Sequence, residues 1–358
     1  MKKSKISVLF FSCAVMFMSL VGCGSKSSSS DNSSLQNDGQ AQEIIKLRVG
    51  LVTDEGGLGD KSFNDAAYEG LEKIEKDLGF EVTVVEPKQA SDYQAYMDRI
   101  SKNNDVVLGN GYKLRDTLDI VSEQNIDVKY IMIDGVVERD NVYNLTFKEE
   151  EGSFLAGVLA GLTTKTNKIG FIGGTETPLV KKFESGFIAG VKSVNAEAGK
   201  LLEEGKTVRY AGTFSDTSRG YEMAKSLYND GVDIIYHAAG GVGIGMFRAA
   251  KETGNYGIGV DQDQALSLPE YSDVILTSVV KNLRDVVYNV VEGISKGTYE
   301  PGTTQFGLKE NGIYLAPISK DKVSQEILDK VEEYKNKIIN GEIVVPATIE
   351  ELSVFTVQ

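Results

Sequence analysis

The stretch Lys46-Leu-Arg-Val-Gly-Leu-Val52 decides the fold, because this apolar run ends directly in a loop rich in Gly and Asp, Thr53 to Asp60. The next segment, Asn64 to Leu78, has apolar residues at helical spacing and stops at Gly79. A strand, a Gly-rich loop and an amphipathic helix in this order are typical of one βα unit of a parallel sheet.

The same alternation continues along the chain in two series. The first series predicts further strands and helices at 80–85, 92–101, 105–108, 114–124 and 130–133. The second series starts with a helix and then alternates again, at 153–162, 168–172, 180–196, 208–210, 219–228, 233–236, 246–252, 256–260, 274–279, 283–295 and 323–339. We therefore predict an α/β protein of two lobes, each a parallel sheet with helices on both faces.

Composition narrows the possible classes of function. The chain has 358 residues, which at about 150 residues per domain favours two domains. Its formal net charge of −14 argues against a nucleic-acid partner, because a protein that binds phosphates needs a basic surface. One His and two Cys exclude a structural zinc site built from several of these ligands.

The N-terminus predicts export and a lipid anchor. A Lys-rich start is followed by a short apolar run, Ile6 to Leu20, which falls below the about 20 residues of a membrane span and is typical of a signal peptide, here 1–22. The run ends in Leu20-Val-Gly-Cys23, which resembles the lipobox of bacterial lipoproteins. We expect Cys23 to be lipidated and to hold the protein on the extracytoplasmic face of the cell membrane. The alternative is an ordinary secretory signal with an incidental Cys.

The segment that follows Cys23 has the composition of a linker. Residues 24–42 are rich in Ser and contain no aromatic side chain, so they cannot bury enough apolar surface to offset their chain entropy. We predict a flexible tether over 23–45, which makes the lipid the only contact with the membrane.

Acidic residues stand where three predicted strands end, at Asp54, Asp134 and Asp261. Ligands of such sheets bind beyond the carboxyl ends of the strands. Carboxylates accept two hydrogen bonds in one plane, which suits a vicinal diol or the N–H edge of a base. The alternatives are capping of the next helix, general acid–base catalysis or metal binding. Because no further acidic cluster surrounds Asp261, we predict no metal.

Two Phe residues, one His and one Lys are the other residues considered for contact with a ligand. Phe63 and Phe214 lie in polar, loop-like stretches, where core packing and a place in the cleft are equally compatible with the sequence. Together they could enclose a flat ring between them. His237 is expected to be a structural residue at a strand end, whereas Lys281 is either a surface residue or a donor to a ligand hydroxyl.

Gly240-Gly-Val-Gly-Ile-Gly245 also follows a predicted strand. Its spacing is not that of a dinucleotide-binding loop, so we predict no cofactor. The glycines would instead let backbone amides approach a neutral ligand closely.

Four segments resemble signature stretches of the basic membrane protein (BMP) family, the lipoprotein substrate-binding components of ABC transporters, in which purine nucleoside receptors form one branch. They are Thr53-Asp-Glu-Gly-Gly-Leu-Gly-Asp-Lys-Ser-Phe-Asn64, Phe147-Lys-Glu-Glu-Glu-Gly-Ser-Phe-Leu-Ala-Gly157, His237-Ala-Ala-Gly-Gly-Val-Gly-Ile-Gly245 and Gly257-Ile-Gly-Val-Asp-Gln-Asp-Gln264. The resemblance extends from about Lys46 to about Pro346.

The resemblance implies the type I periplasmic-binding-protein fold, two lobes joined by three hinge crossings with a nucleoside between them. The lobes are then expected at 46–146 plus 279–304 and at 147–278 plus 305–358. Phe63 and Phe214 match the rings that flank the base. Asp54, Asn64 and Asp134 match polar groups near the base edge, and Gly240, Asp261 and Lys281 match the ribose-binding side. Asn110 matches a residue of a loop that faces the cleft.

The function implied is the capture of a nucleoside of the inosine, guanosine or adenosine class, by lobe closure, for an ABC transporter permease. We expect a monomer without catalytic residues. The residues also fit other functions: binding of a monosaccharide or another small polar metabolite, a surface nucleoside hydrolase, or an adhesin without a small ligand. A transcription regulator of this fold would carry a helix-turn-helix where the signal and tether stand.

Overall fold

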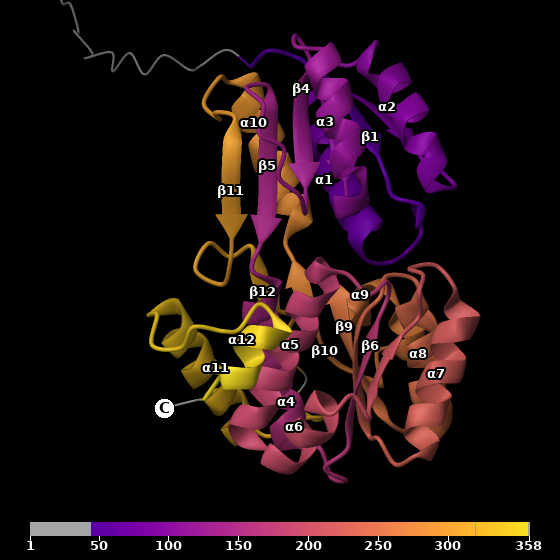
Figure 1. Cartoon of the computed structure of the whole chain (residues 1–358), viewed down its shortest axis with the longest axis vertical. Helices are drawn as coiled ribbons and strands as arrows, with labels where there is room; N and C mark the ends of the chain where they lie inside the picture. The colour runs from indigo at the N-terminus through magenta and orange to yellow at the C-terminus, as the bar shows by residue number, and fades with distance from the viewer. Residues whose placement is uncertain (1–43, 319, 357–358) are drawn as a thin grey trace, which may run out of the picture. The chain divides into compact units, whose positions relative to one another are not determined.

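The computed structural model describes residues 44–318 and 320–356, so the predicted signal peptide, Cys23 and most of the predicted tether lie outside the described residues. Within that range the chain contains two sheets (Figure 1). We name the two lobes by these sheets and the helices that pack on them.

The first lobe contains a six-stranded sheet in the order β11-β5-β4-β3-β1-β2, in which all neighbouring strands are parallel. Its strands are β1 (Arg48–Val52), β2 (Glu81–Val85), β3 (Val106–Asn110), β4 (Lys129–Ile133), β5 (Val142–Phe147) and β11 (Gly302–Phe306). Its helices are α1 (Phe63–Leu78), η1 (Ala90–Asp92), α2 (Tyr93–Ser101), η2 (Tyr112–Leu114), α3 (Arg115–Gln124) and α10 (Leu283–Ser295).

The second lobe contains a six-stranded sheet in the order β12-β10-β9-β8-β6-β7. Its strands are β6 (Ile169–Gly173), β7 (Val208–Tyr210), β8 (Ile234–Ala238), β9 (Tyr256–Asp261), β10 (Ile275–Lys281) and β12 (Ile313–Leu315). Its helices are α4 (Glu149–Thr163), α5 (Pro178–Val194), α6 (Ala196–Glu203), α7 (Thr217–Asn229), α8 (Val242–Thr253), α9 (Gln264–Ser267), η3 (Pro269–Tyr271), α11 (Gln325–Ile339) and α12 (Ile349–Val354).

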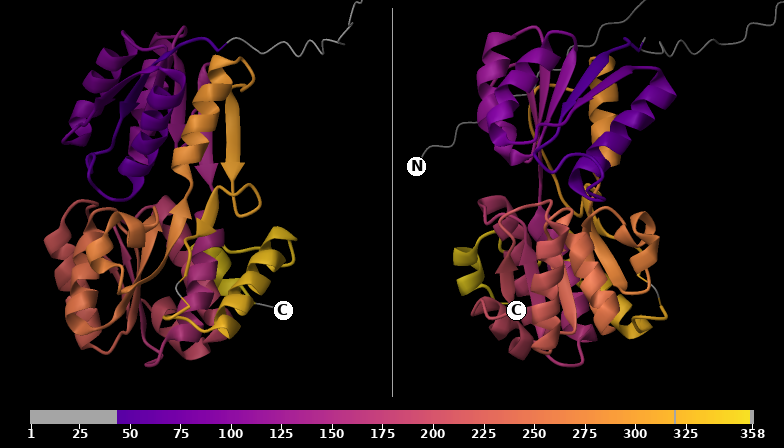
Figure 2. Two further views of the ribbon diagram at one scale, coloured as in Figure 1. Left: turned by 180° about the vertical axis from the view of Figure 1, so that it is seen from behind. Right: turned by 90° about the vertical axis from the view of Figure 1, so that its right-hand side faces the viewer.

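The apolar strands are buried on both faces, because their side chains alternate between two cores. In β1, Leu51 packs in the cluster that contains Leu71 of α1. The next residue, Val52, packs in a second cluster with Met97 of α2 and Leu118 of α3. Helices therefore cover both faces of the sheet, as predicted (Figures 1 and 2).

The chain passes between the two lobes at three places (Figure 2). The first crossing joins β5 to α4, the second joins β10 to α10, and the third, at 307–312, joins β11 to β12. β10 stays paired in the second sheet as far as Lys281, and β11 stays paired in the first as far as Phe306. The lobe boundaries predicted after residues 278 and 304 thus fall slightly before the ends of these two strands.

The sequence patterns missed three strands, β5, β11 and β12. β12 is antiparallel to β10, at the edge of a sheet whose other neighbouring strands are parallel. β11 is an edge strand of mostly polar residues and β12 is very short, so neither gives a continuous apolar run. Helix α4 begins at Glu149 rather than Ser153, and its three consecutive Glu residues suit the positive end of the helix dipole.

Candidate functional site

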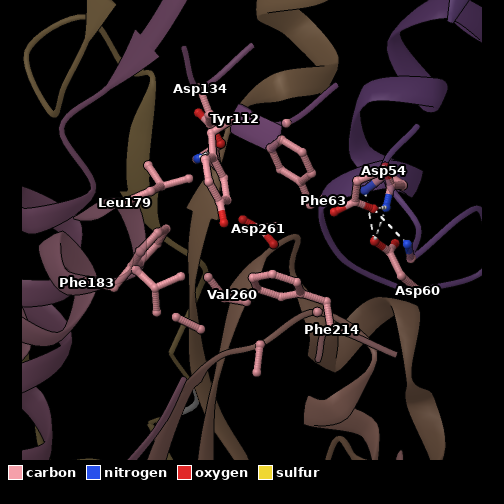
Figure 3. A pocket seen from close by; sticks show the side chains of 18 of the residues that line it. Asp54, Asp60, Phe63, Tyr112, Asp134, Leu179, Phe183, Phe214, Val260 and Asp261 are labelled. Atoms are coloured by element: carbon pink, nitrogen blue, oxygen red, sulfur yellow. Dashed lines mark hydrogen bonds and ion pairs between the residues drawn. The ribbon is translucent and has the colours of Figure 1, made fainter. Parts of the chain in front are cut away.

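A cavity lies between the two lobes, beyond the carboxyl ends of the parallel strands (Figure 3). It contains about 650 Å³ of space not filled by atoms, part of it continuous with solvent. Residues of the first lobe that line it are Asp54, Gly56, Asp60, Phe63, Asn64, Gly111, Tyr112, Lys113 and Asp134, and those of the second are Leu179, Val180, Phe183, Phe214, Ala238, Ala239, Gly240, Val260, Asp261 and Lys281.

The cavity wall includes every predicted ligand-binding residue except Asn110. Asn110 is the last residue of β3 and is fully buried. Its Nδ2 donates to Asn64 Oδ1 at 3.0 Å, so Asn110 supports a residue of the wall and is not part of the wall. For Asn110 and for the residues of the wall alike, contact with a ligand stays a prediction.

The two predicted aromatic residues come from opposite lobes. Phe63 is the first residue of α1, and Phe214 lies in the loop between β7 and α7. Both rings line the cavity, and Figure 3 shows them apart from each other, with the Asp261 side chain in view between them. Each ring has a nearby ammonium, Lys281 Nζ at 5.2 Å from the Phe63 centroid and Lys113 Nζ at 5.5 Å from the Phe214 centroid. A planar group could therefore enter between them and stack on both.

On one side of Phe63, the amide of Asn64 links two carboxylates. Asn64 Nδ2 donates to Asp54 Oδ1 at 2.9 Å and to Asp60 Oδ2 at 3.1 Å. Asp60 is itself held by the backbone N–H groups of Ser62, Asn64 and Asp65. Because both its donors and its oxygen are engaged within the protein, Asn64 fixes Asp54 in place, and the acceptor that remains for a ligand is Asp54 Oδ2.

Burial raises the pKa of both carboxyl groups, Asp54 and Asp60. It raises the pKa of Asp60 to about 7, although three backbone N–H groups act in the opposite direction. It also raises the pKa of Asp54, against the hydrogen bonds from Asn64 and Gly56. Such costly groups on a cavity wall are typical of a functional site.

On the other side of the cavity, Lys281 lies among carboxylates. Its Nζ is 2.7 Å from Asp134 Oδ2 and 3.0 Å from Glu149 Oε1, and all three side chains are almost completely buried. Burial lowers the pKa of Lys281, but the charges of Asp134, Glu149 and Asp261 outweigh burial and raise it above its ordinary value. Lys281 is therefore a charged donor, whereas burial raises the pKa of Asp134 to about 6.

Two of the carboxylates have an unusual backbone conformation. Asp134 and Asp261, directly at the ends of β4 and β9, have φ values of 63° and 65°. L-residues adopt this left-handed region at a cost, and such strain concentrates at binding sites. Neither residue caps a helix, since the N-cap of α9 is Asp263 and β5 follows Asp134. The helix-capping alternative is thus wrong for these two positions.

Several residues of the wall escaped the sequence analysis. Leu179, Val180 and Phe183 lie in the first turns of α5, where apolar periodicity predicted only a buried face. Tyr112 follows Gly111, whose backbone has φ of 120° directly after β3. An aromatic residue beside a Gly at a strand end is a signal that could have identified Tyr112. Nothing in the apolar pattern of α5 distinguishes its cavity side from its core side.

His237 has a structural place, as predicted. It is fully buried in β8, and its Nε2 lies 2.8 Å from Gln264 Oε1. Burial lowers the pKa of His237 to about 4, against the effect of Gln264. The imidazole is therefore neutral at pH 7, and it is not among the residues that line the cavity.

Polar contacts join the lobes beside the cavity. Ser62 Oγ in the first lobe donates to Asp261 Oδ2 in the second. Gln264 Nε2 donates to Lys61 O at 2.9 Å, and Gln262 Nε2 donates to Glu69 Oε1 at 3.0 Å. The structure is thus a closed arrangement, in which the second lobe contacts the start of α1.

Residues 44–318 and 320–356 offer no candidate for a membrane-spanning helix or for a metal-binding cluster. None of the helices there is long and apolar enough to cross a membrane. In the same residues, no three or more His, Cys, Asp or Glu side chains are grouped so that they could hold a metal ion.

A cavity enclosed by two lobes, with aromatic faces, acceptors and a single buried ammonium, defines a protein that closes around a small polar molecule. Comparison with known families agrees with this class. Residues 47–349 match the family model of Bmp, described as ABC transporter substrate-binding protein PnrA-like. The chain belongs to this family of ABC transporter substrate-binding proteins.

Relatives of similar sequence identity have three different names. The chain is 36% identical to the CD4+ T-cell-stimulating antigen of Listeria innocua, over 97% of this chain and 99% of that protein. It is 34% identical to the ABC transporter nucleoside-binding protein BmpA of Lactococcus lactis, over 97% and 100%. It is also 34% identical to Basic membrane protein A of Borreliella burgdorferi, over 98% of each chain.

Solved structures show the same fold. An ABC transporter solute-binding protein from Aeropyrum pernix has a TM-score of 0.73 and 26% identity, over 86% of this chain and 97% of that one. A solute-binding protein from Conexibacter woesei has a TM-score of 0.67 and 23% identity, over 84% and 99%, and supports the fold alone. The predicted type I periplasmic-binding-protein fold is thereby confirmed.

Proposed function

We propose that this chain captures purine nucleosides on the extracytoplasmic side of the membrane, anchored by lipid at Cys23, and delivers them to an ABC importer. The supporting observation is the pairing of Phe63 and Phe214 across a cavity whose polar side chains are mainly carboxylates. A purine offers two flat faces for the rings, and its N–H groups and the ribose hydroxyls offer donors for the carboxylates. The name of the Lactococcus lactis relative includes nucleoside binding, which agrees with the proposal.

The proposed arrangement places the base between the rings, with one edge towards Asp54, and the ribose near Lys281. Gly111 lies next to both the Phe63 ring and the Asp54 carboxylate. A Cβ at Gly111 would lie 3.5 Å from Phe63 Cε1 and 4.0 Å from Asp54 Oδ2. A ring stacked on Phe63 would thus present an edge to Asp54. Asp134 lies on the other side of Phe63 from Asp54 (Figure 3), and its Oδ2 is 2.7 Å from Lys281 Nζ. The proposal therefore assigns Asp134 to the sugar, together with Lys281, and not to the base edge.

Buried acceptors without partners favour a ligand rich in donors. Asp134 Oδ1 is buried and accepts no hydrogen bond from the described residues, and an unmatched buried acceptor costs about 1–3 kcal/mol. A ribose hydroxyl would supply the missing donor. A phosphate would instead meet Asp54, Asp134 and Asp261 without an Arg on the wall, so nucleotides should bind far more weakly than nucleosides.

Closure would be driven by contacts that the two lobes make only together. A ligand shifts a protein towards the state in which it has more contacts. A nucleoside stacked on Phe63 gains the Phe214 ring and Asp261 only after the second lobe has closed. The three crossings between the lobes are the proposed hinges, at the transitions from β5 to α4, β10 to α10 and β11 to β12.

The first experiment identifies the ligand that the protein retains. Mass spectrometry of small molecules released on denaturing the purified protein should detect a purine nucleoside. Calorimetry then compares inosine, guanosine and adenosine with ribose, glucose and inosine 5′-monophosphate. Binding of sugars without nucleosides would overturn the proposal, and release of hypoxanthine from inosine would replace it with a hydrolase.

The anchor is tested separately, because it depends on residues outside the described range. A Cys23→Ser variant should leave the membrane fraction, whereas nucleoside affinity of the purified protein should stay unchanged. Retention of this variant in the membrane would contradict lipidation at Cys23.

A further inference from the structure

Glu149 is a buried charge outside the cavity wall. It is the first residue of α4, directly after the crossing from β5, and its side chain has no exposed surface. It does not line the cavity. A carboxylate in such a place is costly unless it is paired, so its partners indicate its role.

The two oxygens of Glu149 serve two ammonium groups. Oε1 is 3.0 Å from Lys281 Nζ, and Oε2 is 3.1 Å from Lys182 Nζ. Lys182, on α5, also donates to Phe147 O at 3.0 Å. Glu149 therefore links the start of α4, next to the first crossing, with the end of β10, where the second crossing begins.

The two carboxylates that contact Lys281 belong to different lobes. Asp134 follows β4 in the first sheet, whereas Glu149 begins a helix that packs in the second lobe with β10. When the lobes separate, Asp134 moves with the first lobe and Glu149 stays with Lys281. Of these two partners, only Glu149 would accompany the ammonium through the whole cycle.

We propose that Glu149 is a positioning residue for ligand binding, which keeps Lys281 oriented towards the ribose side of the cavity in both the open and the closed arrangement. This inference rests on the proposed function, because it assigns Lys281 to a sugar hydroxyl.

The aromatic rings around Lys281 give a physical reason why its ammonium needs a carboxylate to orient it. Lys281 Nζ lies 5.2, 5.1 and 5.6 Å from the ring centroids of Phe63, Phe147 and Phe183. These faces attract the ammonium but offer no directional acceptor. A carboxylate held by Lys182 supplies that direction, because its Oε1 lies 3.0 Å from Lys281 Nζ and attracts the ammonium towards one fixed point.

The experiment compares Glu149→Gln with the unaltered protein on two ligands, inosine and 2′,3′-dideoxyinosine. The two ligands share the base and differ only in the sugar hydroxyls. We expect Glu149→Gln to weaken inosine binding about tenfold or more, the effect of removing one member of a buried charge pair. Binding of the dideoxy ligand should change less than about twofold, since stacking of the base is unaffected. A merely structural role would weaken both ligands equally.

A matched control removes a charge from the same helical turn. Glu151 accepts from the N–H of Leu308 at 2.8 Å and pairs with Lys148, and neither contact involves Lys281. Glu151→Gln should leave the affinity ratio of the two ligands unchanged. The double variant Glu149→Gln/Lys281→Met should bind inosine no more weakly than Lys281→Met alone, because Glu149 acts through Lys281.

Failure of the inference is distinguishable from failure of the proposed function. If the unaltered protein binds inosine and Glu149→Gln keeps the affinity ratio, the inference is overturned and the function stands. If the unaltered protein binds no nucleoside, the proposed function fails first. Should Glu149→Gln not fold, Glu149→Asp retains the charge with a shorter reach, and an unchanged ratio in that variant overturns the inference.

Discussion

Replacing Phe63 by Ala tests the central feature of the site. Phe63 begins α1, and its partly buried ring borders the cavity without belonging to the fully buried core. The substitution therefore removes one wall of the proposed sandwich and leaves the sheet and its helices in place. Stacking of a base on an aromatic ring contributes about 1–3 kcal/mol, which corresponds to a loss of about 5- to 150-fold in affinity.

Isothermal titration calorimetry with inosine at 25 °C measures this loss. We expect at least a tenfold increase in Kd, and an intermediate value for Phe63→Leu, which keeps apolar volume but has no π face. Tyr288→Ala is the matched control, since this aromatic residue on α10 of the same lobe contacts Lys73 and does not line the cavity.

Circular dichroism and thermal melting would show that each variant is folded. A Kd for Phe63→Ala within about twofold of the unaltered protein would refute the reasoning. The ring would then contribute nothing to stacking, and the ligand would bind elsewhere in the cavity or have no planar group.

Three further predictions concern pH, packing and closure. The folded pKa of His237 is lowered to about 4, so its stabilising contribution is complete above about pH 6.5 and lost as the pH falls towards 4. Relative to His237→Gln, the unaltered protein should lose about 1.4 kcal/mol of unfolding free energy per pH unit in that window, and parallel urea-unfolding curves would contradict this. Gly190→Ala places a Cβ 2.0 Å from Phe154 O, where α5 meets α4, and should lower unfolding free energy by about 1–3 kcal/mol; an unchanged urea midpoint would disprove it. Ser62→Ala removes the contact with Asp261 between the lobes and should open the ligand-free protein; identical small-angle scattering curves would argue against this role.

The sequence predicted the parts of the site that depend on local pattern. Strand ends are recognisable because an apolar run stops at Gly or Asp, so Asp54, Asp134 and Asp261 could be placed at one edge of each sheet. The family resemblance added Phe63 and Phe214, whose positions alone left core and cleft equally open.

Other features depended on contacts between distant residues. Asn110 follows the pattern of a strand-end residue in sequence, but only the fold shows that its side chain donates to Asn64, a residue of the cavity wall. Phe183 was missed for the opposite reason, since nothing local marks it as a cavity residue. Glu149 is one of three adjacent Glu residues, and only the packing of α4 against α5 and β10 shows which of them pairs with Lys281.

The sequence by itself thus indicated the alternation of strands and helices apart from β5, β11 and β12, the presence of two lobes and the acidic ends of the strands. Periodicity is a local property, and it reports which face of a segment is apolar. The tertiary structure decided which polar groups pair across the hinge, because Asp134, Glu149 and Lys281 come from three separate segments. Their pairing follows from how the lobes pack, and a buried charge acquires its orientation only from partners that folding brings together.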